Sequence, residues 1–319
     1  MRARFWLGWV ASAVLALGCG QDESGGGGSG AASTEPIKVG HFASLTGDTA
    51  SFGQSSDKGI RMAIEEINAK GGVLGRPIEI ISEDDRSITE EARTAALKLI
   101  QRDEVVALLG EISSSRSLAA APEAQRAQIP MISPGSTNPD VTKIGDYVFR
   151  ACFIDPFQGS VMARFAVDEL KVKRAAVLFD YKQDYSVGLA AFFRDKFKQL
   201  GGEIVGDAVE GYYFSNHYAP ESEDPKVQAF VAKYKEKYGS VPDAMAALGY
   251  DSAGILADAL TRAGTTENVK LRDAIAATKD YPGVTGSITM DADRNAQKGA
   301  VVLKIENKRF NFYRSVPAS

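Results

Sequence analysis

Short apolar runs alternate with amphipathic stretches from residue 36 onward. The stretch 58–70 has the helical period, because Ile60, Ile64 and Ile67 fall on one face and Gly71-Gly72 follows as a helix stop. Strands that alternate with helices in this way are typical of a parallel sheet with crossover helices, so the pattern predicts a doubly wound α/β fold. Its first strands are predicted at 37–42, 78–81, 105–109 and 131–133.

Residues that commonly cap helices stand at the start of several amphipathic stretches. Ser87 and Glu90 have the spacing of a capping box, and Asp155, Asp224 and Asp243 each adjoin a proline at a predicted helix start. A new series of strands and helices begins near residue 154, which predicts a second domain. Further helices are predicted at 115–128, 156–170, 186–200 and 271–278, and further strands at 175–179, 203–205, 285–290, 300–305 and 309–313.

The beginning of the chain has a different pattern. Two arginines and an apolar run at 5–17, too short to span a bilayer, are followed by Gly18 and Cys19. This layout indicates an export signal at 1–18 and lipidation of Cys19, although a cleaved signal peptide with an incidental cysteine remains the alternative. Residues 19–35 are rich in glycine and serine and predict a flexible tether. We therefore expect a bacterial cell-envelope protein that faces the periplasm or the exterior.

Length and charge narrow the class of protein. The part from residue 36 to 319 is long enough for two domains, and 44% hydrophobic residues can fill their cores. Removal of residues 1–18 moves the net charge from −4 to −6, which argues against nucleic acid as a partner. Once Cys19 serves as the anchor, Cys152 has no partner for a disulfide within the chain, so we expect a small buried apolar residue there.

Motifs of known catalytic or cofactor sites are missing from the sequence. His41 and His217 are its only histidines, and no zinc-binding spacing, no GxSxG elbow, no Walker loop and no GxGxxG fingerprint occurs. We expect no metal, no cofactor and no enzymatic activity.

A run of hydroxyl residues marks a candidate site for a carboxylate. Ser113-Ser114-Ser115 follows a strand and opens a helix, where hydroxyls and free backbone N–H groups meet the positive end of the helix dipole. At least one of these serines is also expected to cap the helix. Glu111, next to the run, is expected to be a solvated residue at a strand end.

From Pro36 almost to its end, the chain resembles the type I periplasmic binding proteins of the leucine/isoleucine/valine-binding group. Each matching segment is weak alone, but their order and spacing together are specific. The segments are 44–47, 52–53, 67–72, 113–115, 132–139 and 184–186 with Gly188.

The resemblance implies two discontinuous α/β lobes joined by three crossing strands. Lobe one would hold residues 36–153 and about 218–293, and lobe two about 154–217 and 294–319. Lobe two departs from the family after about residue 208, where roughly 50 to 70 residues are absent, judged from the size of a βαβ unit. In the family this stretch carries an acidic residue for the ligand ammonium and an aromatic that packs on the ligand.

The resemblance also implies a ligand site between the lobes. Ser114 and Thr137 would donate to a ligand carboxylate, flanked by Ser113 and Ser136, and the carbonyl of Gly135 would accept from an ammonium group. Phe52, Tyr185 and Tyr250 would enclose the ligand side chain, with ordinary packing as the alternative for each.

Two functions from different classes follow. The first is capture of an amino acid, branched-chain foremost, or a related amide by hinge closure, and its delivery to the membrane permease of an ABC importer. The second is a non-binding or decayed paralogue, because part of lobe two is missing. A ligand-sensing envelope protein shares the fold and stays open as well.

Overall fold

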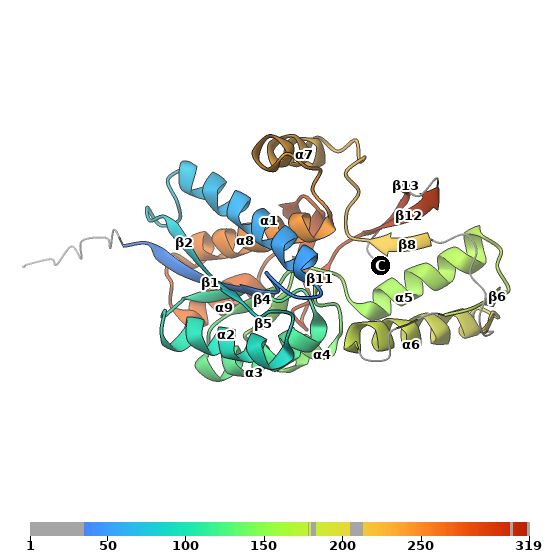
Figure 1. Ribbon diagram of the computed structural model, residues 1–319, viewed down its shortest axis with the longest axis horizontal. Coiled ribbons are helices and arrows are strands. Elements are labelled where there is room, and N and C mark those ends of the chain that lie inside the picture. Colours follow the sequence, from blue (N-terminus) through green and yellow to red (C-terminus); the bar gives the residue numbers. More distant parts are fainter. Residues whose placement is uncertain (1–34, 178, 180–182, 205–212, 307–308, 318–319) are drawn as a thin grey trace, which may run out of the picture. The chain divides into compact units, whose positions relative to one another are not determined.

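A five-stranded parallel sheet forms the centre of the first half of the molecule (Figure 1). The computed structural model describes residues 35–177, 179, 183–204, 213–306 and 309–317. The strand order β2-β1-β3-β4-β5, with every pair parallel, confirms the predicted doubly wound α/β fold. The strands are β1 (Ile37–Ala43), β2 (Ile78–Asp84), β3 (Ala107–Leu109), β4 (Met131–Ser133) and β5 (Val148–Arg150).

Helices cover both faces of this sheet. One core lies between the sheet and α1, α8 and α9, and a second lies on the other face under α2 and α3 (Figure 1). Strands buried on both faces read as continuous apolar runs, which is why the sequence pattern revealed them. The helices are α1 (Ala50–Ala69), α2 (Thr89–Gln101), α3 (Ser114–Ala127), α8 (Ala244–Ala263) and α9 (Asn268–Ala276), and a short α4 (Asp140–Lys143) precedes β5.

Gly59 allows α1 and α8 to cross closely. A Cβ atom at this position would lie 1.9 Å from the carbonyl oxygen of Ala246, which belongs to the backbone of α8. We expect Gly59→Ala to lower the free energy of unfolding by about 1–3 kcal/mol, because the two helices must separate. Urea unfolding measures this loss. Gly239→Ala is the control, because no atom lies within 4 Å of the added Cβ there. Gly239 has a positive φ, so this variant measures the cost of the backbone conformation without a clash.

A second group of elements follows β5. Helices α5 and α6 pack side by side beside a two-stranded parallel pair, β6 and β7, and β8 joins an antiparallel sheet with β12 and β13 (Figure 1). The elements of this group are α5 (Asp155–Arg164) with the π-helical turn η1 (Phe165–Glu169), β6 (Arg174–Ala175), α6 (Asp184–Gln199), β7 (Glu203–Ile204), β8 (Tyr213–Asn216), β12 (Ala300–Glu306) and β13 (Arg309–Val316). Helix α7 (Pro225–Tyr238) packs on α1 and α8 instead, and β9 (Tyr281–Gly283), β10 (Gly286–Met290) and β11 (Ala296–Gln297) form a small antiparallel sheet against the first core.

Some element boundaries and caps differ from the predictions. Helix α1 begins at Ala50, eight residues before the predicted start, and β6 ends at Ala175 instead of continuing to 179. The predicted capping box is wrong, because Ile88 is the N-cap of α2 and the Ser87 hydroxyl donates to the carbonyl of Thr46 at 2.9 Å. Asp155 is likewise the first residue of α5 and not its cap.

Two predicted caps are confirmed. The Asp224 carboxylate accepts from the N–H of Lys226 at 2.8 Å, and the Asp243 carboxylate accepts from the N–H of Ala246 at 3.0 Å. Proline follows Asp224 directly, where its missing N–H costs no helical hydrogen bond. The division of the chain into lobes at about 153, 218 and 293 stays a prediction.

Candidate functional site

The serine run lies at the N-terminus of α3, as predicted. Ser113 is the N-cap residue in an extended conformation, as expected for one serine of the run, but its side chain makes no capping hydrogen bond. The hydroxyls bond to neighbouring segments instead. Ser114 Oγ accepts from the N–H of Asn138 at 3.2 Å, and Ser115 Oγ donates to Asp184 on α6 at 2.7 Å. The run therefore joins the loop after β4 to the start of α6.

The loop after β4 brings the other predicted donors to the same place. Ser136 and Thr137 are both buried, and Gly135 is close enough to Ile112 that an added Cβ would lie 3.1 Å from its side chain. The Ser136 hydroxyl donates to the carbonyl of Glu111 at 2.9 Å, whereas the Thr137 hydroxyl has no hydrogen-bond partner among the described residues. The Thr137 hydroxyl is close enough to the Asp155 carboxyl to lower the pKa of that group, so the two side chains are neighbours within the predicted site.

Glu111 is not the solvated residue that we expected. Its side chain is 1% exposed and accepts hydrogen bonds from the N–H groups of Ser44 and Ser113. Burial raises the pKa of the Glu111 carboxyl and also that of nearby Asp85, while the Arg116 guanidinium opposes both shifts. The position after a strand end did not reveal this burial, because the covering loops come from distant parts of the chain.

Asp155 is the polar group of this region that sequence reasoning missed. It is fully buried on α5, its N–H donates to the carbonyl of Thr137 at 3.0 Å, and neither carboxylate oxygen has a hydrogen-bond partner in the described part of the chain. Burial raises the pKa of the Asp155 carboxyl to about 6, although the nearby Thr137 hydroxyl and Arg150 partly oppose this. An unpaired buried carboxylate is costly, and such groups commonly belong to binding sites.

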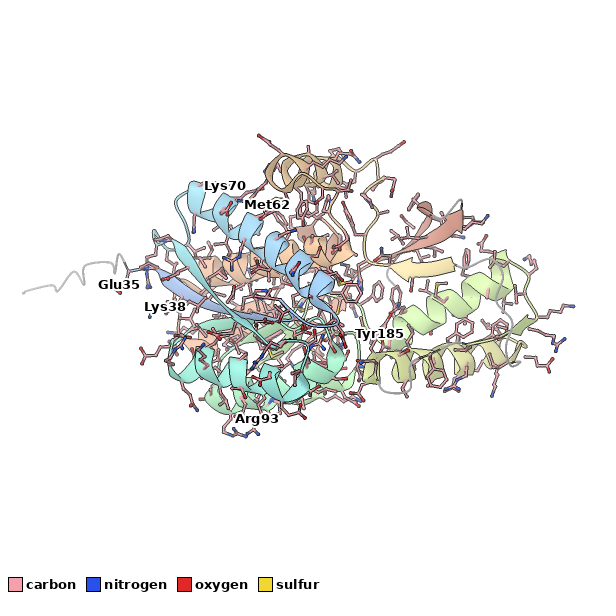
Figure 2. The ribbon with its side chains drawn as sticks, viewed as in Figure 1. Glu35, Lys38, Met62, Lys70, Arg93 and Tyr185 are labelled. Atoms are coloured by element: carbon pink, nitrogen blue, oxygen red, sulfur yellow. The ribbon has the colours of Figure 1, made fainter. Side chains whose placement is uncertain are left out.

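The start of α6 adds two residues to the site. Gly188 lies beside Asp155, since an added Cβ would be 3.3 Å from its Oδ2 atom. Tyr185 is in the first turn of α6, and its hydroxyl accepts from Nε2 of Gln158 at 3.3 Å (Figure 2). Gln158 follows Asp155 by one turn of α5, so Tyr185 and Asp155 face the same region.

Phe52 and Tyr250 have no described contact with the serine run. Phe52, in the first turn of α1, is 50% exposed and lines a cavity of about 460 Å³ together with residues of β8 and the start of α8. Tyr250 donates to Glu66 at 2.9 Å, and its ring packs edge-on against Phe230 with 5.1 Å between ring centroids. The described contacts of Tyr250 are thus those of a packing residue.

The remaining predicted groups have other environments. Cys152 is a buried free thiol, as expected, and burial raises its pKa to about 11. His217 stacks on Phe153 with 3.8 Å between ring centroids. Within the described ranges, no cluster of three acidic, histidine or cysteine side chains could hold a metal ion, and no helix has the length and apolar content to cross a bilayer. Cys19 lies outside the described residues.

Comparison with known proteins identifies relatives of this chain. A family model described as "Periplasmic binding protein" matches residues 36–209 and 206–309. An "Amino acid binding protein" of Pseudomonas aeruginosa is 37% identical over 170 residues, which are 53% of this chain and 45% of that protein. A "Leucine-specific-binding protein" of Salmonella typhimurium is 34% identical over 175 residues, 54% of this chain and 47% of that protein. The chain spans about half the length of the curated relatives it matches.

Solved structures resemble this one over most of its length. The leucine-binding protein LivK of Thermotoga maritima has a TM-score of 0.82 and 34% identity, with 88% of this chain and 99% of that chain covered. The substrate-binding protein LivJ of Streptococcus pneumoniae, solved with isoleucine, has a TM-score of 0.81 and 28% identity, with coverage of 89% and 99%. The fold is that of the type I periplasmic binding proteins, and with a family model matched over most of its length the chain belongs to the family of periplasmic binding proteins.

Proposed function

We propose that this protein is the lipid-anchored substrate-binding protein of an ABC importer and that it captures an amino acid. The ligand would lie between the serine run and α5, its carboxylate on Ser114 and Thr137 and its ammonium on Asp155 and the carbonyl of Gly135. Cys19 would carry the anchor, and a permease in the membrane would accept the ligand. The names of the relatives make branched-chain amino acids the first candidates.

The unpaired carboxylate of Asp155 is the observation that carries this proposal. A free amino acid needs donors at one end and an acceptor at the other, because both of its charges lose water on binding. The Thr137 hydroxyl and both Asp155 oxygens make no hydrogen bond of standard geometry among the described residues, and the hydroxyl is close enough to the carboxyl to lower its pKa. The shortened second lobe would lack the acidic residue that meets the ammonium in the family. Asp155 would supply this negative charge instead.

A non-binding paralogue is the second candidate. The two segments that match the family model meet at residues 206–209, close to the predicted loss after residue 208. Strand β6 has two residues and β7 is described for two, and the pair they form joins no other strand among the described residues. Both observations favour a second lobe that has lost part of its sheet.

Binding of L-leucine to the purified chain tests the proposal. A ligand that binds only the folded state raises the melting temperature, so we expect a clear shift in a screen of the twenty amino acids. Binding should weaken at low pH, because the ammonium favours ionised Asp155, whose pKa is about 6 in the free protein. From pH 7 to pH 5 we expect the Kd from calorimetry to rise by about tenfold, one unit of pKa being a factor of ten.

The outcomes separate the two candidates. A cooperative melt that no amino acid or amide shifts would contradict capture and support the non-binding paralogue. Affinity that is constant between pH 5 and pH 7 would mean that Asp155 does not meet the ammonium.

A further inference from the structure

The Glu111 side chain connects two loops that border the serine site. Its Oε1 atom accepts from the N–H of Ser44 at 3.1 Å and lies 3.0 Å from the Ser44 hydroxyl, in the loop between β1 and α1. Its Oε2 atom accepts from the N–H of Ser113, at the start of α3. One carboxylate therefore fixes the loop that leads to α1 and the N-terminus that holds the serine run.

The main chain of Glu111 holds a third loop. Its carbonyl oxygen accepts from the hydroxyls of Ser133, the last residue of β4, at 2.6 Å and of Ser136, in the loop after β4, at 2.9 Å. Ser117 on α3 also donates to it, at 3.1 Å. These bonds depend on the backbone alone, so a substitution of the side chain leaves them in place.

The buried groups around Glu111 carry more potential negative charge than positive charge. Arg116 on α3 lies 3.3 Å from Glu111 and 3.8 Å from Asp85, which is in the loop after β2, and all three side chains are buried. Two carboxyls thus share one guanidinium. Glu111→Gln would leave one opposite pair, Arg116 and Asp85, so the substitution breaks the bond to one loop without leaving an unpaired buried charge, while the amide oxygen can keep the bond to the other loop.

We propose that Glu111 is the positioning residue of this site, which holds the loop at 44–49 and the start of α3 so that the serine run and Thr137 face the ligand together. The effect of Glu111 on ligand affinity rests on the proposed function. Its effect on the two loops can be measured without ligand. In the Glu111→Gln variant the new amide nitrogen must face an N–H donor on one side or the other, because both oxygens of the native carboxylate accept.

Hydrogen exchange in the full-length chain tests the proposal, with Glu111→Gln compared to Glu123→Gln. Glu123 is also buried, 3% exposed, and pairs with Arg93 and Arg126 at the far end of the same helix. In Glu111→Gln we expect the backbone amides of 44–49 or those of 112–117, whichever segment faces the new amide nitrogen, to exchange at least tenfold faster, while 133–137 stays unchanged. The Kd for L-leucine should rise roughly tenfold, which is the effect of one lost charged hydrogen bond. Glu123→Gln should change neither.

Each result bears on the proposal. Unchanged exchange at 44–49 and 112–117 overturns it, and so does faster exchange with unchanged affinity, because a merely structural role would lower stability and leave the affinity of folded protein intact. If the wild-type chain binds no L-leucine, the proposed function fails, and exchange still decides whether Glu111 holds the loops. If Glu111→Gln does not fold, Ser44→Ala removes the hydroxyl that lies within hydrogen-bond distance of both Glu111 and Asp85, and it should speed exchange at 44–49 alone.

Discussion

Asp155→Asn is expected to weaken L-leucine binding by at least about 30-fold while raising the stability of the free protein at pH 7. The loss follows because the ammonium would lose its charged partner in a buried site, which typically costs about 2–5 kcal/mol. The gain follows because the wild-type carboxylate is buried without hydrogen bonds. Residues of binding sites often lower the stability of the protein without ligand, as we expect for Asp155.

The pH dependence of this gain has a definite sign. The pKa of Asp155 is about 6 in the folded protein against an ordinary value of 3.8, so the ionised form destabilises the fold. The loss of folding free energy from ionised Asp155 is absent below about pH 4 and grows as the pH rises to 6. Above pH 6 it reaches about 3 kcal/mol. The difference in melting temperature between Asp155→Asn and wild type should therefore be largest at pH 7 and shrink towards pH 5. Wild-type affinity in the variant would show that the carboxylate does not meet the ligand.

Asp251→Asn is expected to have the opposite effect on stability, although Asp251 is as buried as Asp155. The Asp251 carboxylate accepts from the N–H groups of Val284 and Thr285 at 2.7 and 2.9 Å and from the Thr285 hydroxyl at 2.6 Å. It also interacts electrostatically with Lys298, whose pKa burial lowers to about 8. Burial raises the pKa of the Asp251 carboxyl too, but here, unlike at Asp155, Lys298 and two N–H groups oppose the shift. An amide would turn a donor towards donors and leave Lys298 without its opposite charge, so we expect a loss of about 3–5 kcal/mol in the free energy of unfolding.

Urea unfolding at pH 7 measures this loss, with Asp155→Asn as the matched control for the same substitution at a buried aspartate. The double variant Asp251→Asn, Lys298→Met should recover part of the loss, because it removes the buried charge that the single variant leaves unpaired. A loss below about 1 kcal/mol would mean that the hydrogen bonds of Asp251 contribute little to stability.

The sequence predicted those helices and strands that depend on residues close together in the chain. The parallel sheet was predictable because its strands are continuous apolar runs, and the starts of α7 and α8 because Asp224 and Asp243 bond to N–H groups two and three residues away. The start of α1 was missed, since the helical period is weak in 50–57, and so was the burial of Gly53 and Ser56 in its first turns.

The candidate site divides in the same way. The family resemblance implied that Ser113, Ser114 and the segment 135–137 belong to one site, and the structure places them near the ends of the neighbouring parallel strands β3 and β4. The sequence did not predict that Glu111 is buried, that Asp155 is unpaired rather than a helix cap, or that Asp251 is bonded on both oxygens. Phe52 and Tyr250 remain unconnected to the serine run in the described contacts.

The sequence by itself thus determined the fold class and the family of this protein, together with the position of its serine run. Only the tertiary structure decided which charged groups are buried and which of them have partners. The physical reason is distance along the chain: Glu111 bonds to Ser44, 67 residues away, and Asp251 bonds to Thr285, 34 residues away. The sequence near a charged residue predicts an exposed side chain, because it does not contain the distant segment that buries it.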